Sequence, residues 1–140
     1  MTATQVIDST RTATGTRLAP LWAGGLGVAD AMDTAQRNMG LDALATRELI
    51  ARSSAAAREE GGSIAVGVNT DSRTEEMLTL DEIERAYLEQ LEFAEAQGAL
   101  PVIMASRHLA RAAQSPADYA RVYTRVLGAA AGPQASALGL

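Results

Sequence analysis

The sequence contains no lysine and no cysteine, and only 4% of its 140 residues are aromatic. All 12 of its basic residues are arginine, which stays protonated and therefore cannot form a Schiff base. Without cysteine, the chain can form no disulfide, thiol nucleophile or thiolate metal site. Covalent catalysis by a side-chain amine or thiol of this chain is therefore excluded.

The sequence also lacks a basic region and a long apolar run. Its net charge is −5, and acidic residues and arginines are interspersed, which gives no electrostatic footprint for nucleic acid or an anionic membrane. No apolar run approaches the roughly 20 residues of a membrane span. The threonine-rich start has neither the basic nor the apolar part of a signal sequence. We therefore expect a cytoplasmic protein with no nucleic-acid or membrane partner.

Short apolar runs and helical patterns alternate along most of the chain. Residues 1–20 are polar and threonine-rich, and we predict a disordered leader there. Three apolar runs then follow glycines, each succeeded by a helical pattern, and are typical of buried strands: residues 25–31, 63–69 and 101–106.

The predicted helices have recognisable ends. The first covers 42–60 and is stopped by a Gly-Gly pair. Thr79 and Glu82 form the pattern of a capping box, which opens a second helix that ends at Gly98. A Ser-Pro pair at 115–116 opens the third helix, with proline at its first position.

The order strand–helix, repeated three times, predicts an α/β fold with a parallel sheet. A barrel segment and a doubly wound sheet both fit this order. Ile64, Val66 and Val68 alternate with small or polar residues, which favours a barrel wall. A whole barrel needs about 250 residues, and 133–140 do not resemble a next strand. We therefore predict a partial (β/α)8 (TIM) barrel of about three βα units over 21–132, with an irregular tail over 133–140.

Several stretches together resemble a known family. They are LGVADAMDTAQRNMGL at 26–41, TRELI at 46–50, VIMASR at 102–107, SPADY at 115–119 and the Val-Tyr pair at 122–123. In combination they resemble an uncharacterised branch of the dihydrodipicolinate synthase-like, class I aldolase-type barrel proteins, whose members are more than twice as long. The resemblance covers roughly 21–132.

The resemblance implies a chemistry that this chain cannot complete. In the family, a lysine late in the barrel forms a Schiff base with a 2-oxo acid such as pyruvate, and a tyrosine on a strand relays protons. A threonine-containing turn after the second strand holds the substrate carboxylate; its counterpart here is Met32-Asp-Thr-Ala35, which departs from the usual Gly-Thr-Thr-Gly. Tyr87, Tyr119 and Tyr123 lie in helical patterns. We therefore expect part of a carbon–carbon lyase or hydro-lyase without a cofactor, inactive as this chain alone.

Barrel active sites gather at the carboxyl ends of the strands. Polar residues at these ends give the candidate substrate-binding set: Asp33, Thr34, Asn69, Asp71, Ser106 and Arg107. Arg107 would bind the oxo-acid carboxylate, and Thr34 or Ser106 would donate hydrogen bonds to it. Alternatively, Asp33 and Asp71 cap the turns that follow them, and Arg107 pairs with one of them.

Two other functions remain open at this level. Asp33, Asn69 and Asp71 offer oxygen ligands that suit magnesium, as in a metal-dependent barrel enzyme, although their spacing does not demand a metal. A partial barrel with bare sheet edges would instead self-associate as a non-catalytic homo-oligomer. His108, the only histidine, follows a strand end, and we predict a solvated loop residue there in preference to a general base.

Overall fold

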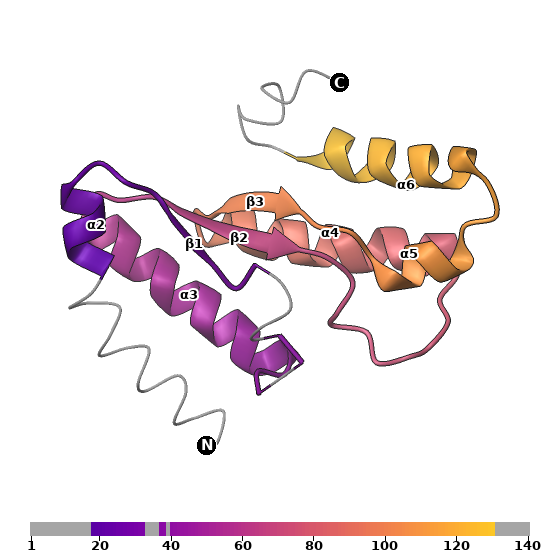
Figure 1. The fold of residues 1–140 in the computed structure, drawn as a ribbon, viewed down its shortest axis with the longest axis horizontal. Coiled ribbons are helices and arrows are strands. Elements are labelled where there is room, and N and C mark those ends of the chain that lie inside the picture. Colours follow the sequence, from indigo (N-terminus) through magenta and orange to yellow (C-terminus); the bar gives the residue numbers. More distant parts are fainter. Residues whose placement is uncertain (1–17, 33–36, 39, 131–140) are drawn as a thin grey trace.

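The computed structural model describes residues 18–32, 37–38 and 40–130, and Figure 1 shows its arrangement. Among the described residues, a short helix is followed by three strands that alternate with helices, and β3 is followed by two consecutive helices. The elements are α2 (Ala19–Ala23), β1 (Val28–Asp30), α3 (Ala43–Glu59), β2 (Ile64–Val68), α4 (Leu80–Ala96), β3 (Leu100–Ile103), α5 (Arg107–Ala112) and α6 (Pro116–Ala129).

The three strands form one parallel sheet in the order β1-β2-β3. Val28 is aligned with Ile64, and Val66 with Pro101. This confirms the predicted α/β fold with three parallel strands. Each strand is shorter than its apolar run; β1 is followed by Ala31, whose φ of 48° turns the chain out of the extended conformation.

One face of the sheet carries the core. Ile64, Val66 and Val68 are buried and belong to the same apolar cluster as side chains of α3 and α4. On the same face, Ser53 of α3 donates a 2.6 Å hydrogen bond to Oδ2 of Asp30 in β1. Strands in chain order with their connecting helices on one face form consecutive βα units, as a partial (β/α)8 barrel requires.

The opposite side of β2 allows a close backbone approach. A Cβ atom on Gly67 would lie 1.9 Å from the carbonyl oxygen of Met32, a clash with backbone that only glycine avoids. The chain leaving β1 can therefore cross closely over β2 near the carboxyl end of the sheet.

The amino ends of the strands are packed by α2. Trp22 is 7% exposed, and its Nε1 donates a 3.0 Å hydrogen bond to the carbonyl of Ser63, just before β2. Its ring occupies the space where a Cβ of Gly62 would stand. Ala19 and Pro20, from the segment predicted to be a leader, belong to this helix. Leu18 is the N-cap of α2, while residues 1–17 and the tail at 133–140 lie outside the described residues.

The long helices begin where the sequence predicts. Both hydrogen bonds of the Thr79–Glu82 capping box are present at the start of α4. The carboxylate of Asp118 accepts the backbone N–H of Ser115 at the start of α6. Helix α5 was not predicted; Ser106 is its N-cap and accepts the N–H of Leu109 at 3.1 Å.

Helix α6 packs beside α4. Its buried Val122 and Val126 join the main core, and Arg121 forms ion pairs with Asp81 and Glu84 of α4. Within 18–32, 37–38 and 40–130, no helix combines the length and the apolar character needed to cross a membrane.

Candidate functional site

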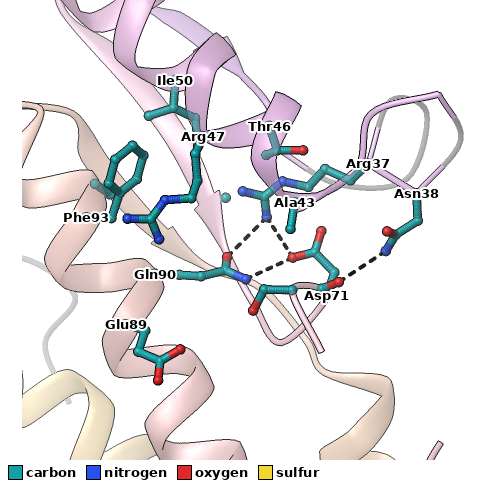
Figure 2. Close-up of a pocket in the computed structure, with 13 residues that line it drawn as sticks. Arg37, Asn38, Ala43, Thr46, Arg47, Ile50, Asp71, Glu89, Gln90 and Phe93 are labelled. Carbon is teal, nitrogen blue, oxygen red and sulfur yellow. Dashed lines mark hydrogen bonds and ion pairs between the residues drawn. The ribbon is translucent and has the colours of Figure 1, made fainter. Parts of the chain in front are cut away.

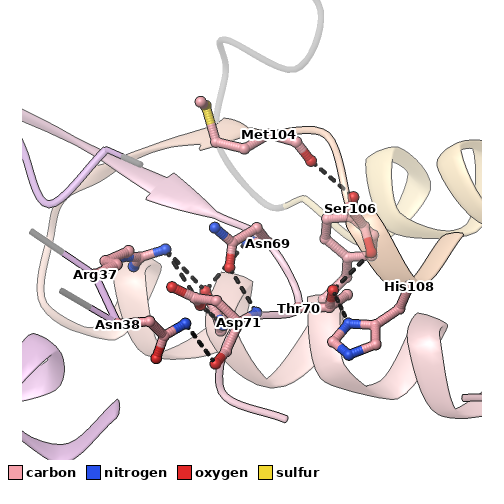
Figure 3. Close-up of polar contacts among 10 residues, drawn as sticks. Arg37, Asn38, Asn69, Thr70, Asp71, Met104, Ser106 and His108 are labelled. Carbon is pink, nitrogen blue, oxygen red and sulfur yellow. Dashed lines mark hydrogen bonds and ion pairs between the residues drawn. The ribbon is translucent and has the colours of Figure 1, made fainter. Parts of the chain in front are cut away.

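Two polar clusters lie at the carboxyl ends of β2 and β3 (Figure 3). We name them by their members. The arginine cluster comprises Arg37, Asn38, Asn69, Asp71 and Gln90; the hydroxyl cluster comprises Thr70, Ser106 and His108.

The arginine cluster is built around a buried guanidinium. The Arg37 side chain is 4% exposed, and its Nη1 lies 3.6 Å from Oδ1 of Asp71. The same nitrogen donates to Oε1 of Gln90 at 3.4 Å, and Nε2 of Gln90 donates to Oδ1 of Asp71 at 2.9 Å. Gln90, which lies on α4, thus forms hydrogen bonds with both Arg37 and Asp71 and holds these two charged side chains in place.

The backbone after β2 is held by side chains of the same cluster. Asn69 donates its N–H to Oε1 of Gln90 at 3.2 Å, and its own Oδ1 accepts the N–H of Asp71 at 2.8 Å. Asn69, and not Asp71, therefore caps the turn. Asn38 reaches the carbonyl of Asp71 from the other side at 3.4 Å.

The hydroxyl cluster is a short chain of buried hydrogen bonds. Oγ of Ser106 lies 2.6 Å from Oγ1 of Thr70, which lies 2.7 Å from Nδ1 of His108. Nε2 of His108 is 2.9 Å from the carbonyl of Glu75, which can only accept, so Nε2 carries a proton. In the neutral imidazole, Thr70 donates to Nδ1, and Ser106 then donates to Thr70.

The prediction of a solvated His108 is wrong. The residue is 1% exposed, because it lies in the first turn of α5, where its imidazole contacts Thr70 and the carbonyl of Glu75. Both ring nitrogens have partners, which compensates for burying a polar ring.

Tyr87 brings a further hydroxyl to the end of β3. Its side chain is fully buried on α4, and its O–H donates a 2.7 Å hydrogen bond to the carbonyl of Met104. Burial, assisted by the neighbouring Tyr123, raises the pKa of this phenol well above its ordinary value. The ring meets that of Tyr123 edge to face, with centroids 6.2 Å apart.

The candidate residues from the sequence occupy different places. Asp33 and Thr34 lie outside the described residues. Asn69 and Asp71 lie together in the arginine cluster, and Ser106 belongs to the hydroxyl cluster. Arg107 is exposed at the start of α5, and the carboxylate of Asp71 faces Arg37 instead of Arg107.

Sequence reasoning missed Arg37 and Gln90. Gln90 carried a usable signal: it lies three residues after Tyr87 and four before Ala94, so it interrupts the apolar stripe of α4 with an amide. Arg37 has no comparable signal, because nothing in its neighbourhood sets one arginine apart from the others.

The described part of the chain contains no group of three His, Cys, Asp or Glu side chains placed to hold a metal ion. There, Oδ1 of Asp71 contacts Arg37 and Gln90, and the backbone carbonyl of Asp71 accepts a hydrogen bond from Asn38. The chemistry these groups can support is hydrogen bonding and charge pairing at the ends of the strands.

The chain was compared with known proteins. The model of a family described as "Protein of unknown function (DUF993)" matches residues 2–135. No curated protein matches the chain.

Proposed function

We propose a function for the chain on the premise that it belongs to the DUF993 family, whose model spans nearly all of it. The chain forms one side of a dihydrodipicolinate synthase-like barrel that acts on a 2-oxo acid as a carbon–carbon lyase or hydro-lyase. It contributes a carboxylate-binding rim, and a lysine outside this chain supplies the Schiff base.

The observation that carries the proposal is the position of polar groups at the carboxyl ends of two of the three parallel strands, β2 and β3. Asn69 and Asp71 follow β2, and Ser106 and Arg107 follow β3. In barrels of this kind, substrates bind at these ends. The resemblance of 26–41 and 102–107 to the aldolase-type family supports the same end of the sheet.

Arg107 is the group best suited to a substrate carboxylate. It is exposed, and it forms no ion pair with another described residue. A guanidinium binds a carboxylate through two parallel N–H donors. The hydroxyl of Ser106, by contrast, donates to Thr70 while His108 is neutral, so Ser106 takes part in ligand binding only if that hydrogen bond is exchanged.

The test is a titration of the 15N-labelled chain with pyruvate at constant ionic strength, followed by NMR. We expect saturable shifts of the backbone amides of 69–71 and 104–107, and a dissociation constant raised by roughly tenfold in Arg107→Gln. Arg111→Gln is the matched control, since it removes an exposed arginine from the same helix.

Borohydride reduction with pyruvate tests the part of the proposal that places the Schiff-base lysine outside this chain. Because the sequence has no lysine, an adduct is expected at most on the α-amino group of Met1, and acetylation of that group should abolish it. Equal effects of Arg107→Gln and Arg111→Gln, or the absence of shifts at the strand ends, would contradict the carboxylate-binding role.

A second candidate is a non-catalytic self-associating barrel wall. It is favoured by the described sheet, in which β1 and β3 are edges and Leu100 of β3 is 38% exposed. Bare edges of a sheet pair readily with other chains.

A further inference from the structure

The hydrogen bonds of the hydroxyl cluster have a fixed direction while His108 is neutral (Figure 3). Nε2 of His108 donates to the carbonyl of Glu75 at 2.9 Å, so only Nδ1 is open to a second proton. Thr70 donates to Nδ1 at 2.7 Å, and Ser106 donates to Thr70 at 2.6 Å. The one proton of the Ser106 hydroxyl is therefore used inside the cluster.

Protonation of His108 reverses this direction. Both nitrogens of an imidazolium are donors, so Nδ1 then donates to Oγ1 of Thr70. Thr70 is 2% exposed, and its own proton needs a new acceptor, which within the hydroxyl cluster is Oγ of Ser106. Ser106 no longer donates to Thr70, and its hydroxyl proton becomes available to another acceptor.

Ser106 lies next to the exposed Arg107 at the start of α5. In the reversed state its Oγ accepts from Thr70 and, at 3.1 Å, from the N–H of Leu109. Both lone pairs are then occupied, so the hydroxyl can interact with a further group only as a donor. In the free chain the phenol oxygen of Tyr87 can accept this proton. A carboxylate bound to Arg107 accepts it more strongly, because that hydrogen bond is charge-assisted.

An imidazolium at His108 lacks a countercharge within the described residues. The residue is 1% exposed and forms no ion pair with a carboxylate there. Asp71 is paired with Arg37 (Figure 2), and Glu76 with Arg111. A buried cation without an opposite charge is costly, so a bound carboxylate would stabilise it. The charged or titratable side chains on the elements that contact His108 are Arg107 and Arg111 of α5, Asp71, Arg73, Glu75 and Glu76 of the loop at 69–79, and Tyr87 on the buried face of α4.

We propose that carboxylate binding at the rim is coupled to the uptake of one proton from solvent by His108. The inference rests on the proposed function, because it needs a carboxylate at Arg107. The ligand accepts the Ser106 proton that the reversal makes available, and its charge stabilises the imidazolium. Such coupling is reciprocal, so protonation of His108 strengthens carboxylate binding by the same factor by which the carboxylate favours protonation.

The test measures the dissociation constant of pyruvate for the whole chain as a function of pH, at constant ionic strength. Histidine is the side chain that titrates between about pH 5 and 8, His108 is the only histidine in the sequence, and pyruvate stays ionised throughout this range. We expect pyruvate to bind roughly tenfold more tightly at the acidic end of the range than at the alkaline end. Calorimetry in two buffers with different heats of ionisation should show proton uptake on binding.

Variants separate the hydroxyl cluster from a general effect of pH. Thr70→Val removes the hydroxyl between His108 and Ser106 and should make the dissociation constant independent of pH. Thr74→Val, at an exposed threonine of the same loop, is the matched control and should keep the dependence. If circular dichroism shows that Thr70→Val does not fold, the original chain still decides. Its imidazole 15N signals should change to those of the imidazolium at a higher pH with saturating pyruvate than without it.

The failure of this coupling and the failure of the proposed function give different results. Binding of pyruvate that is independent of pH and takes up no proton would overturn the coupling and leave the rim standing. The same holds for an equal pH dependence in Thr70→Val and Thr74→Val, because the hydroxyl of Thr70 would then transmit nothing. Absence of pyruvate binding at 104–107 at every pH would contradict the proposed function, and the coupling with it.

Discussion

At the scale of single residues, Tyr87 joins the helix layer to the sheet. Its ring is buried among the core side chains, and its hydroxyl satisfies the carbonyl of Met104 just beyond β3. A buried phenol that donates to a carbonyl is stable only in its protonated form, because ionisation would remove the donor and place a charge in an apolar environment.

Tyr87 should make the fold sensitive to alkali. Its pKa is raised by burial above the ordinary value of about 10, so above that pH the unfolded chain loses the proton while the folded chain keeps it. The free energy of unfolding should then fall by up to about 1.4 kcal/mol per pH unit from this group.

Urea denaturation between pH 8 and 12 measures this effect. Tyr87→Phe should lower stability by roughly 1–3 kcal/mol at pH 8, because the carbonyl of Met104 loses its donor, and should reduce the slope above pH 10. Tyr119→Phe, at a half-exposed phenol on α6, is the control. If the free energy of unfolding of Tyr87→Phe fell with pH above 10 as steeply as that of the original chain, another group would be the cause of the alkaline destabilisation.

Contacts between residues could be predicted only where the two residues are close together in the sequence. The proximity of Asn69 and Asp71 follows from their spacing after a strand, and Thr79–Glu82 follows from a local motif. The partners of Asp71, Tyr87 and His108 come from distant parts of the sequence. Those contacts depend on how α4 and α5 pack on the sheet, which residue identity alone does not specify.

At the scale of helices and strands, α4 is the central element. It contacts β2, β3, α5 and α6, and it carries Tyr87 to the carboxyl end of β3 and Gln90 to the turn after β2. Its first turn is fixed by reciprocal hydrogen bonds between Thr79 and Glu82, and hydrogen bonding to Thr79 lowers the pKa of the Glu82 carboxyl.

Removing this cap should destabilise the fold. Thr79→Ala deletes the acceptor for the backbone N–H of Glu82 and should lower the free energy of unfolding by about 1 kcal/mol. Thr79→Ser keeps the hydroxyl and should stay close to the original value. Thermal and urea unfolding give both numbers, and a Thr79→Ala value equal to that of Thr79→Ser would refute the role of the cap.

The helices were easier to predict than the strands because their ends carry local chemical signals. The predicted 42–60 helix differs from α3 by one residue at each end, and Ser115–Pro116 marks the start of α6. Helix α5 covers only six residues, too few for an apolar period to appear. Strand ends are set by pairing with neighbours, so an apolar run overestimates them.

At the scale of the whole molecule, the sheet is covered unequally. The helices bury the face of Ile64, Val66 and Val68, whereas Ala29 and Leu100 on the other face are exposed. Along β2 this face carries the small residues Ala65 and Gly67, and at Gly67 the backbone of Met32 approaches closely. The order of the strands followed from the sequence. The shape of the exposed face could not be predicted from the sequence, because it depends on how closely Met32, after β1, approaches Gly67.

The chain should therefore associate through β3 at high concentration. Sedimentation velocity should show a weight-average sedimentation coefficient that rises with protein concentration, and Leu100→Lys should shift the population toward monomer. Leu44→Lys is the matched control, because Leu44 is 78% exposed on α3, away from the sheet. A monomer at all concentrations would argue against the self-associating candidate.

The position of the single tryptophan gives the molecule an internal optical reporter. Trp22 contacts Gly62 and Ser63 at the amino ends of the strands, at the opposite end of β2 from Asn69 and Asp71. Its emission will respond when α2 detaches and will remain constant when carboxylates bind at the opposite end. Fluorescence can thus follow the opening of one end of the sheet while NMR observes ligands at the other.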